Sequence, residues 1–167
     1  LGRLNIPYRI TGDPEVVARA DKIIFPGVGA AGAAMKELKK RKLDVFLKKT
    51  KKPVLGICLG AQVLLSEGHE FGIFEGLGII PGKVERFPEL IGGEKIPHVG
   101  WNRVSSPGGE IWNKDFYFVH SYVLKPASID NVFGLTTYGN HKFCSIVKKG
   151  NIYGTQFHPE KSGAAGL

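Results

Sequence analysis

The stretch Val54-Leu55-Gly56-Ile57-Cys58-Leu59-Gly60-Ala61-Gln62 places a cysteine between a strand-like segment and a helix-like segment. Residues 54–57 are typical of a buried strand, and residues 61–65 of the first turns of a helix. Gly56 and Gly60 stand two residues to either side of Cys58, the spacing of a nucleophile elbow in which backbone segments pass closely. At such a turn the thiol faces the positive end of the helix, which favours the thiolate. A buried structural cysteine between two packing glycines explains this stretch equally well.

A second candidate segment follows a β-like run near the end of the chain, Gly154-Thr155-Gln156-Phe157-His158-Pro159-Glu160. A catalytic cysteine needs a base to take and return a proton, and the base needs a third group that fixes its tautomer. Pro159 restricts the backbone on both sides, so the side chains of His158 and Glu160 are expected to be held stiffly. A polar loop with a solvated Glu160 is the alternative. Taken together, the two segments favour a triad of Cys58, His158 and Glu160.

Composition places the chain among ordinary globular proteins. It has 167 residues, 43% hydrophobic and 23% charged, which corresponds to one domain with a sizeable core. No apolar run approaches the ~20 residues of a membrane span, and no secretory leader pattern is present, so we expect a cytoplasmic protein without a membrane partner. Cys58 and Cys144 are expected to stay reduced, with Cys144 in the core. The scattered histidines and the lack of a Cys-x-x-Cys pattern predict no metal and no cofactor.

The net charge of +8 is concentrated in a lysine-rich segment at residues 36–52. Leu38, Leu43, Phe46 and Leu47 recur within it at helical spacing, which predicts one amphipathic helix with a solvated basic face. Nucleic-acid binding needs aromatic residues among the basic ones, and Phe46 belongs to the apolar side. We therefore expect no nucleic-acid partner.

The order of elements predicts an α/β fold. A short strand at 6–10, a helix at 14–20, a strand at 21–25, the basic helix and the segment around Cys58 alternate as in a parallel sheet. From about residue 72, short strands at 84–87, 117–120, 141–147 and 152–157 follow one another, with a hairpin turn at 148–151. The prediction is an open, mixed, mostly parallel sheet with helices on both faces and a nucleophile elbow.

Attack by a thiolate on an amide carbonyl creates an oxyanion, which needs backbone N–H donors. The residue after the nucleophile, Leu59, supplies one in elbow enzymes. The loop Pro26-Gly27-Val28-Gly29 ends the preceding strand, at the sheet edge where α/β active sites gather. A flip of the peptide at Val28 would turn a second donor inward. A plain turn, or a weak phosphate-binding loop, is the alternative.

These segments together resemble the class I, triad-type glutamine amidotransferases. The narrower resemblance is to the glutaminase subunits of imidazole glycerol phosphate synthase, in histidine biosynthesis. It rests on Pro97-His98-Val99-Gly100-Trp101-Asn102 and on Tyr117-Phe118-Val119-His120-Ser121-Tyr122. It covers nearly the whole chain and implies a single amidotransferase domain at residues 1–167. Relative to the family, that domain is expected to lack the first strand and the closing helix.

The resemblance implies roles for individual residues. Cys58 is the nucleophile, His158 the general base and acid, and Glu160 its orienter; Val28, Gly29 and Leu59 serve the oxyanion. The residues that hold the substrate glutamine are Gly29, Gln62, Ser121 and Tyr122.

The resemblance also implies a partner, a cyclase with a (β/α)8 barrel. In the heterodimer the cyclase receives ammonia through a channel and makes imidazole glycerol phosphate and AICAR, a lyase reaction. His98, Trp101 and Asn102 are the expected contacts, although a tryptophan is more often a core residue. Two alternatives stay open: the glutaminase of another amidotransferase, such as pyridoxal phosphate synthase, and a non-catalytic α/β binding module.

Overall fold

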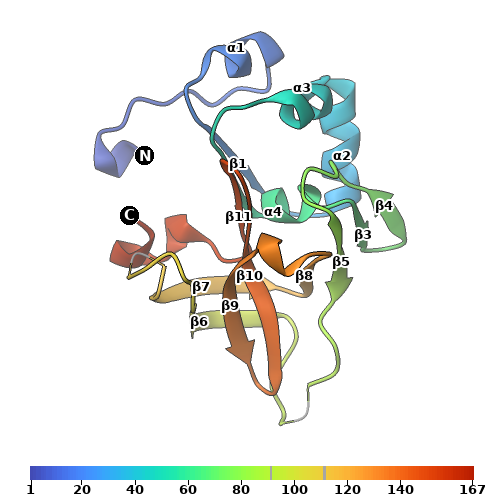
Figure 1. The fold of residues 1–167 in the computed structure, drawn as a ribbon, viewed down its shortest axis with the longest axis vertical. Helices are drawn as coiled ribbons and strands as arrows, with labels where there is room; N and C mark the ends of the chain where they lie inside the picture. The colour runs from blue at the N-terminus through green and yellow to red at the C-terminus, as the bar shows by residue number, and fades with distance from the viewer. Residues whose placement is uncertain (91, 111) are drawn as a thin grey trace.

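The strand that ends at Cys58 lies inside a mixed sheet (Figure 1). The computed structural model describes residues 1–90, 92–110 and 112–167. Over these residues nine strands form one sheet, in the order β1-β2-β11-β10-β8-β5-β3-β4 with β9 paired to β10, and β6 and β7 form a separate ribbon. The strands are β1 (Ile23–Gly27), β2 (Val54–Cys58), β3 (Glu67–His69), β4 (Ile73–Glu75), β5 (Gly82–Arg86), β6 (His98–Arg103), β7 (Asp115–His120), β8 (Tyr122–Pro126), β9 (Val132–Tyr138), β10 (His141–Lys149) and β11 (Ile152–Thr155).

The helices lie around the strands β1, β2 and β11, and Cys58 is the last residue of β2 (Figure 1). They are α1 (Pro14–Arg19), α2 (Ala31–Lys40), α3 (Leu43–Lys49) and α4 (Leu59–Val63), with short 3-10 turns η1 (Gly2–Leu4), η2 (Ile129–Asn131), η3 (Pro159–Lys161) and η4 (Gly163–Gly166). Asp13 caps α1 by accepting a hydrogen bond from Glu15 N. The α4 helix, which begins directly after Cys58, packs on β1, β2 and β11.

The predicted α/β class and mixed sheet are confirmed, but parallel pairs are a minority among the described strands. Three pairs are parallel: β1 with β2, β2 with β11, and β3 with β5. The other neighbours in the main sheet are antiparallel. Tight turns join β3 to β4, β9 to β10 and β10 to β11, whereas β8 pairs with β5 and β10, which do not adjoin it in the sequence. The hairpin predicted at 148–151 is one of these turns, joining β10 to β11 with Lys149 opposite Ile152.

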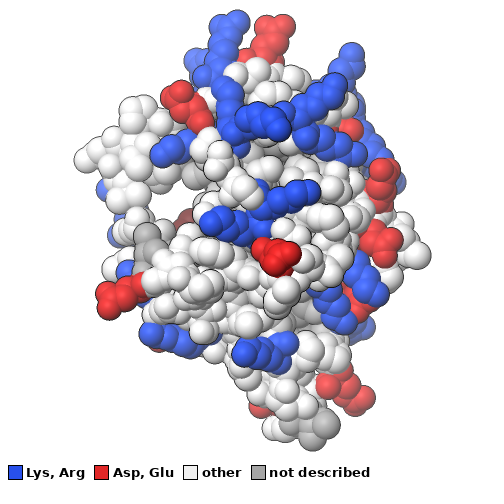
Figure 2. Space-filling model, in the orientation of Figure 1, with Lys and Arg blue, Asp and Glu red and all other residues white. Residues whose placement is uncertain are grey.

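The structure corrects two local predictions near the N-terminus. The basic segment forms two helices instead of one, because Lys42 adopts a left-handed backbone (φ 57°) and breaks the helix between α2 and α3. Its lysines and arginines lie on the surface over these helices, at the top of Figure 2. Residues 6–10 form no strand, because they are exposed and lie beside no other strand. Within the described residues, no helix is both long and apolar enough to cross a membrane.

Two hydrophobic clusters support the site from different sides. The larger one joins α2 and α4 to the sheet through residues such as Met35, Leu59 and Leu64. The second is rich in aromatic side chains and includes Phe116 and Phe118 of β7 together with Phe157. Phe157 is fully buried, stacks on Phe116 at 4.1 Å between ring centroids and meets Phe118 edge-on at 5.6 Å. The residue that precedes His158 is therefore fixed in the core.

Candidate active site

Cys58 sits on a strained turn, as the elbow interpretation predicts. Its backbone has φ 52° and ψ −107°, which is rare for a residue with a side chain, and α4 begins at the next residue. A Cβ on Gly56 would lie 2.7 Å from Gly60 O, and a Cβ on Gly60 would collide with Phe25 O. Both glycines are therefore needed for the strand and helix to meet this closely.

The Cys58 thiol is protonated at rest, which differs from the thiolate that the helix end was expected to favour. Burial raises the pKa of the Cys58 thiol to about 11, and the Leu59 N–H lowers it only in part. α4 has only five residues, so its dipole offers little compensation for the lost hydration. Deprotonation of this thiol consequently requires a base.

His158 and Glu160, the predicted base and orienter, are hydrogen-bonded to each other. Nδ1 of His158 lies 2.7 Å from Oε1 of Glu160. A carboxylate only accepts hydrogen bonds, so Nδ1 carries a proton, and in the neutral ring the lone pair is on Nε2. The His158 side chain is 4% exposed and the Glu160 side chain 52% exposed, so the imidazole is enclosed while its partner reaches solvent.

The sheet brings these two segments together from distant parts of the sequence. β2 and β11 are parallel neighbours, with Ile57 opposite Thr155, so Cys58 and the His158 turn leave the same end of the sheet. Glu160 and Lys161 both act on the thiol electrostatically, Glu160 raising its pKa and Lys161 lowering it. Among the described residues no hydrogen bond joins Cys58 to His158 in this state.

Gln156 is a site residue that the sequence analysis did not identify. Its side chain is fully buried, and its Nε2 lies 3.7 Å from Cys58 Sγ. Its Oε1 accepts a hydrogen bond from Gln62 Nε2 at 3.3 Å. A chain of two amides thus runs from Gln62 to the thiol, and it places Gln62 beside the nucleophile. The sequence feature that could have indicated Gln156 is its polar side chain within the otherwise strand-like run that leads to His158.

The glycine loop Pro26-Gly27-Val28-Gly29 lies next to the elbow. Gly27 is opposite Cys58 in the β1–β2 register, and a Cβ on Gly27 would collide with the Leu59 side chain. Val28 is 84% exposed, and Gly29 has φ 92°. Gly27 is therefore adjacent to Cys58, and Val28 and Gly29, the residues predicted to serve the oxyanion, follow it along the loop.

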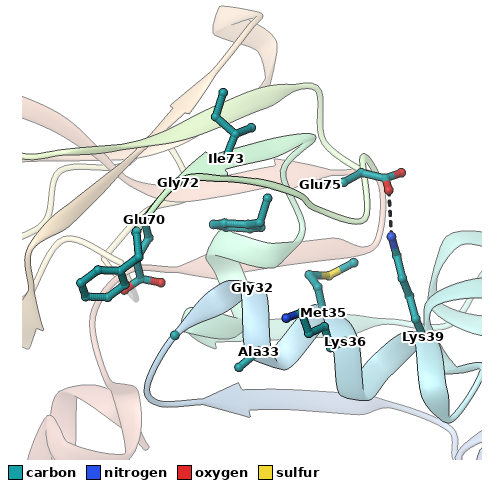
Figure 3. Close-up of a pocket in the computed structure, with 12 residues that line it drawn as sticks. Gly32, Ala33, Met35, Lys36, Lys39, Glu70, Gly72, Ile73 and Glu75 are labelled. Atoms are coloured by element: carbon teal, nitrogen blue, oxygen red, sulfur yellow. Dashed lines mark hydrogen bonds and ion pairs between the residues drawn. The ribbon is translucent and has the colours of Figure 1, made fainter.

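A groove of about 440 Å³ opens between α2 and the β3–β4 hairpin (Figure 3). Glu70 enters it and accepts a hydrogen bond from Ala31 N at 2.8 Å, at the first residue of α2. Lys39 and Glu75 form an ion pair across the other end, at 2.8 Å. Glu70 therefore ties the hairpin to the helix that follows the glycine loop.

Ser121 and Tyr122 lie at the start of β8, which is not a direct neighbour of the strand that carries Cys58. Tyr122 begins β8, which is separated from β2 by β11 and β10 in the sheet order. Both side chains are half-buried, and Ser121 O accepts a hydrogen bond from Phe87 N. Cys58 and the His158 turn, by contrast, follow from the neighbouring strands β2 and β11.

The three predicted partner contacts differ in exposure. Trp101 is 57% exposed and meets Tyr117 edge-on at 6.1 Å, so it is not a core tryptophan. Asn102 uses its amide to bind Thr137 O. His98, for which a hinge role was the alternative to an interface contact, is only 1% exposed and stacks on Tyr138, so its side chain does not reach the surface that carries Trp101. It turns inward because it alternates with Val99 along the strand.

Comparisons with known proteins show the family to which the chain belongs. Residues 7–166 match the family described as glutamine amidotransferase class-I. A solved glutamine amidotransferase shares the fold with a TM-score of 0.77 at 19% identity, over 99% of this chain and 85% of that one. The chain belongs to the class I glutamine amidotransferase family.

Relatives of higher sequence identity belong to one subfamily within this class. The imidazole glycerol phosphate synthase subunit HisH of Acinetobacter baylyi is 44% identical, over 95% of this chain and 80% of its own. The HisH subunit of Methylococcus capsulatus is also 44% identical, over 98% and 81%. Within its class, the chain belongs with these HisH subunits.

Proposed function

We propose that this chain is the glutaminase subunit of imidazole glycerol phosphate synthase. The observation that carries the proposal is the buried Cys58 elbow, at the same end of the sheet as the His158–Glu160 pair. The kinship with HisH subunits assigns the pathway, histidine biosynthesis, and implies a partner subunit.

Our mechanism starts from a protonated thiol and a neutral imidazole. Nε2 of His158 takes the Cys58 proton as sulfur attacks the side-chain amide carbon of glutamine, and Glu160 stabilises the imidazolium that forms. The oxyanion is held by Leu59 N–H and by the Val28–Gly29 backbone. His158 then returns the proton to the leaving nitrogen, which gives ammonia and a γ-glutamyl thioester. Water, activated by the same imidazole, releases glutamate and restores the thiol.

Gln156 fits this sequence of steps as a donor to sulfur. Its Nε2–H points toward Sγ and favours the charged form, which lowers the cost of generating thiolate in a buried site. Gln62, bound to Gln156 on the other side, is placed to read the amide of the substrate. Recognition by paired amides discriminates glutamine from glutamate, because a mismatched group leaves a buried donor unpaired.

The ammonia is consumed by a partner that we propose to be a (β/α)8-barrel cyclase. It would dock on the surface of β6 that carries Trp101 and Asn102, which we call the Trp101 face. An exposed tryptophan backed by Tyr117 is typical of an interface anchor. A channel between the subunits would carry ammonia to the cyclase.

The test separates glutamine-dependent from ammonia-dependent synthesis in the complex with the cyclase. We expect Cys58→Ala to abolish formation of imidazole glycerol phosphate from glutamine and to preserve its formation from added ammonium. Cys144→Ala is the matched control, because Cys144 is buried on β10 and its loss is expected to leave both reactions intact. Loss of both reactions in Cys58→Ala would contradict the division of labour.

A further inference from the structure

The turn that carries His158 is tied to β7 by a side chain to which neither the sequence analysis nor the mechanism gives a role. Ser162 is 1% exposed, and its Oγ donates a hydrogen bond to His158 O at 2.6 Å. The same Oγ accepts a hydrogen bond from Tyr117 N at 3.0 Å. His158 N in turn donates to Tyr117 O at 2.9 Å. Three hydrogen bonds thus form a closed ring of Tyr117, His158 and Ser162.

This ring takes the place of a neighbouring strand. Both backbone groups of Tyr117 bind the His158–Ser162 segment, whereas the next strand in a sheet would normally satisfy them. The segment is too irregular to offer a backbone acceptor to Tyr117 N, and the Ser162 hydroxyl supplies it. One hydroxyl can donate and accept at once, so serine fits this position and alanine does not.

We propose that Ser162 is a positioning residue: its hydroxyl holds the His158–Glu160 turn on β7 and so sets the place of the imidazole relative to Cys58. This inference rests on the proposed function, because it gives the base role to His158. Without the hydroxyl, Tyr117 N–H loses its acceptor and His158 O loses one of two donors, the other being Lys161 N. The turn would then remain attached through His158 N and the Phe157 side chain, with its far end free to shift.

The same strand also links the turn to the Trp101 face. Tyr117 is opposite Trp101 in the β6–β7 register, and the two rings are in contact edge-on. A partner that presses on Trp101 therefore acts on the residue that holds both ends of the His158 turn. The ring of Tyr117, His158 and Ser162 therefore connects that face to the segment that carries the base.

The chain offers a matched control in Ser106. Its Oγ donates to Phe133 O at 2.6 Å and accepts from Gly108 N at 3.2 Å, the same double role on a loop distant in sequence from the site. Ser106 is 7% exposed, so its substitution removes a comparably buried hydroxyl. A general loss of packing would affect both serine variants alike.

The experiment measures glutamine hydrolysis by the complex with the cyclase. We expect Ser162→Ala to lower kcat about 10- to 100-fold with little change in KM, because a small displacement of a base slows chemistry more than binding. Ser162→Thr keeps the hydroxyl and is expected to restore most of the rate, and Ser106→Ala to keep the wild-type rate. If the alanine variant does not fold, Ser162→Gly removes the same hydroxyl beside Gly163, with the same expectation.

A second measurement does not depend on the glutaminase reaction. Iodoacetamide alkylation of Cys58, followed by mass spectrometry across pH, reports how well the imidazole assists the thiol. His158→Asn sets the lower limit, and we expect Ser162→Ala to fall near it and Ser106→Ala near wild type. Equal kcat and equal alkylation profiles in Ser162→Ala and wild type would overturn the positioning role, as would equal losses in the two serine variants. A wild-type complex that does not hydrolyse glutamine would contradict the proposed function instead, and the alkylation profiles would still decide the role of Ser162.

Discussion

Two pairs of hydrogen-bonded side chains place an imidazole ring in different surroundings: His158, the proposed base, beside a carboxylate, and His120 beside a second histidine. His158 donates from Nδ1 to the Glu160 carboxylate and lies at the end of the sheet that carries a thiol. His120 also donates from Nδ1, to Tyr122 O at 2.7 Å, and its Nε2 accepts from His98 Nδ1 at 3.1 Å. The first pair has a negative partner and a free lone pair. In the second pair the printed hydrogen bonds join His120 to a carbonyl and to His98 instead of a carboxylate, and the lone pair on His120 Nε2 is occupied by His98 Nδ1–H.

Their surroundings enlarge the difference. His98 stacks between Phe118 and Tyr138, at 4.8 and 3.9 Å between ring centroids. Burial lowers the pKa of His98 to about 4 and that of His120 to about 3, so both rings stay neutral under ordinary conditions. A buried imidazole can therefore serve as a polar packing unit, and a carboxylate with an adjacent nucleophile is what makes a base.

The largest expected effect separates the two pairs directly. We expect His158→Asn to reduce glutamine hydrolysis about 10²- to 10⁴-fold, the usual contribution of a general acid–base group. His98→Phe keeps an aromatic ring in the stack and is expected to leave the rate within a few-fold of wild type. The measurement is steady-state kcat in the cyclase complex. Equal losses in both variants would remove the distinction between the pairs.

A smaller effect is expected at the carboxylate. Glu160→Gln keeps a side chain of the same size but cannot stabilise an imidazolium, so we expect kcat to fall by about 10²-fold with little change in KM. Ammonia-dependent synthesis is the internal control and is expected to remain. A rate within a factor of two of wild type would show that His158 needs no charged partner.

The smallest effect concerns stability in acid. His98 and His120 titrate in the folded chain at about 4 and about 3, below the ordinary value of 6.5. The unfolded chain therefore binds more protons than the folded chain below pH 6.5, so the free energy of unfolding falls as pH decreases from there toward 4. His98→Phe removes one of the two sites and is expected to reduce the slope by up to about one proton. Urea unfolding at several pH values measures it, and an unchanged slope would rule out His98 as a contributor.

Much of the site is readable from local sequence, because its constraints are local. The glycines around Cys58 and the proline between His158 and Glu160 fix backbone geometry within a few residues, so the elbow and the pair were predictable. The burial of His98 was not, since it depends on Tyr138, forty residues away in the sequence. Gln156 was missed for a similar reason: its importance comes from β11 lying beside β2, which places its amide on the thiol. The direction of a strand was predictable where a tight turn joins it to the next, as at 148–151, and not for β8, which pairs with the non-consecutive strands β5 and β10.

The backbone of Cys58 has a consequence for how this protein can change. A residue with a side chain at φ 52° stores roughly 1–3 kcal/mol of conformational strain, which glycine would not. The substitution that relaxes the turn is thus the one that deletes the sulfur. In the proposed mechanism, fold stability and activity therefore oppose each other at Cys58. Selection for stability alone would favour loss of the sulfur and hence of glutaminase activity.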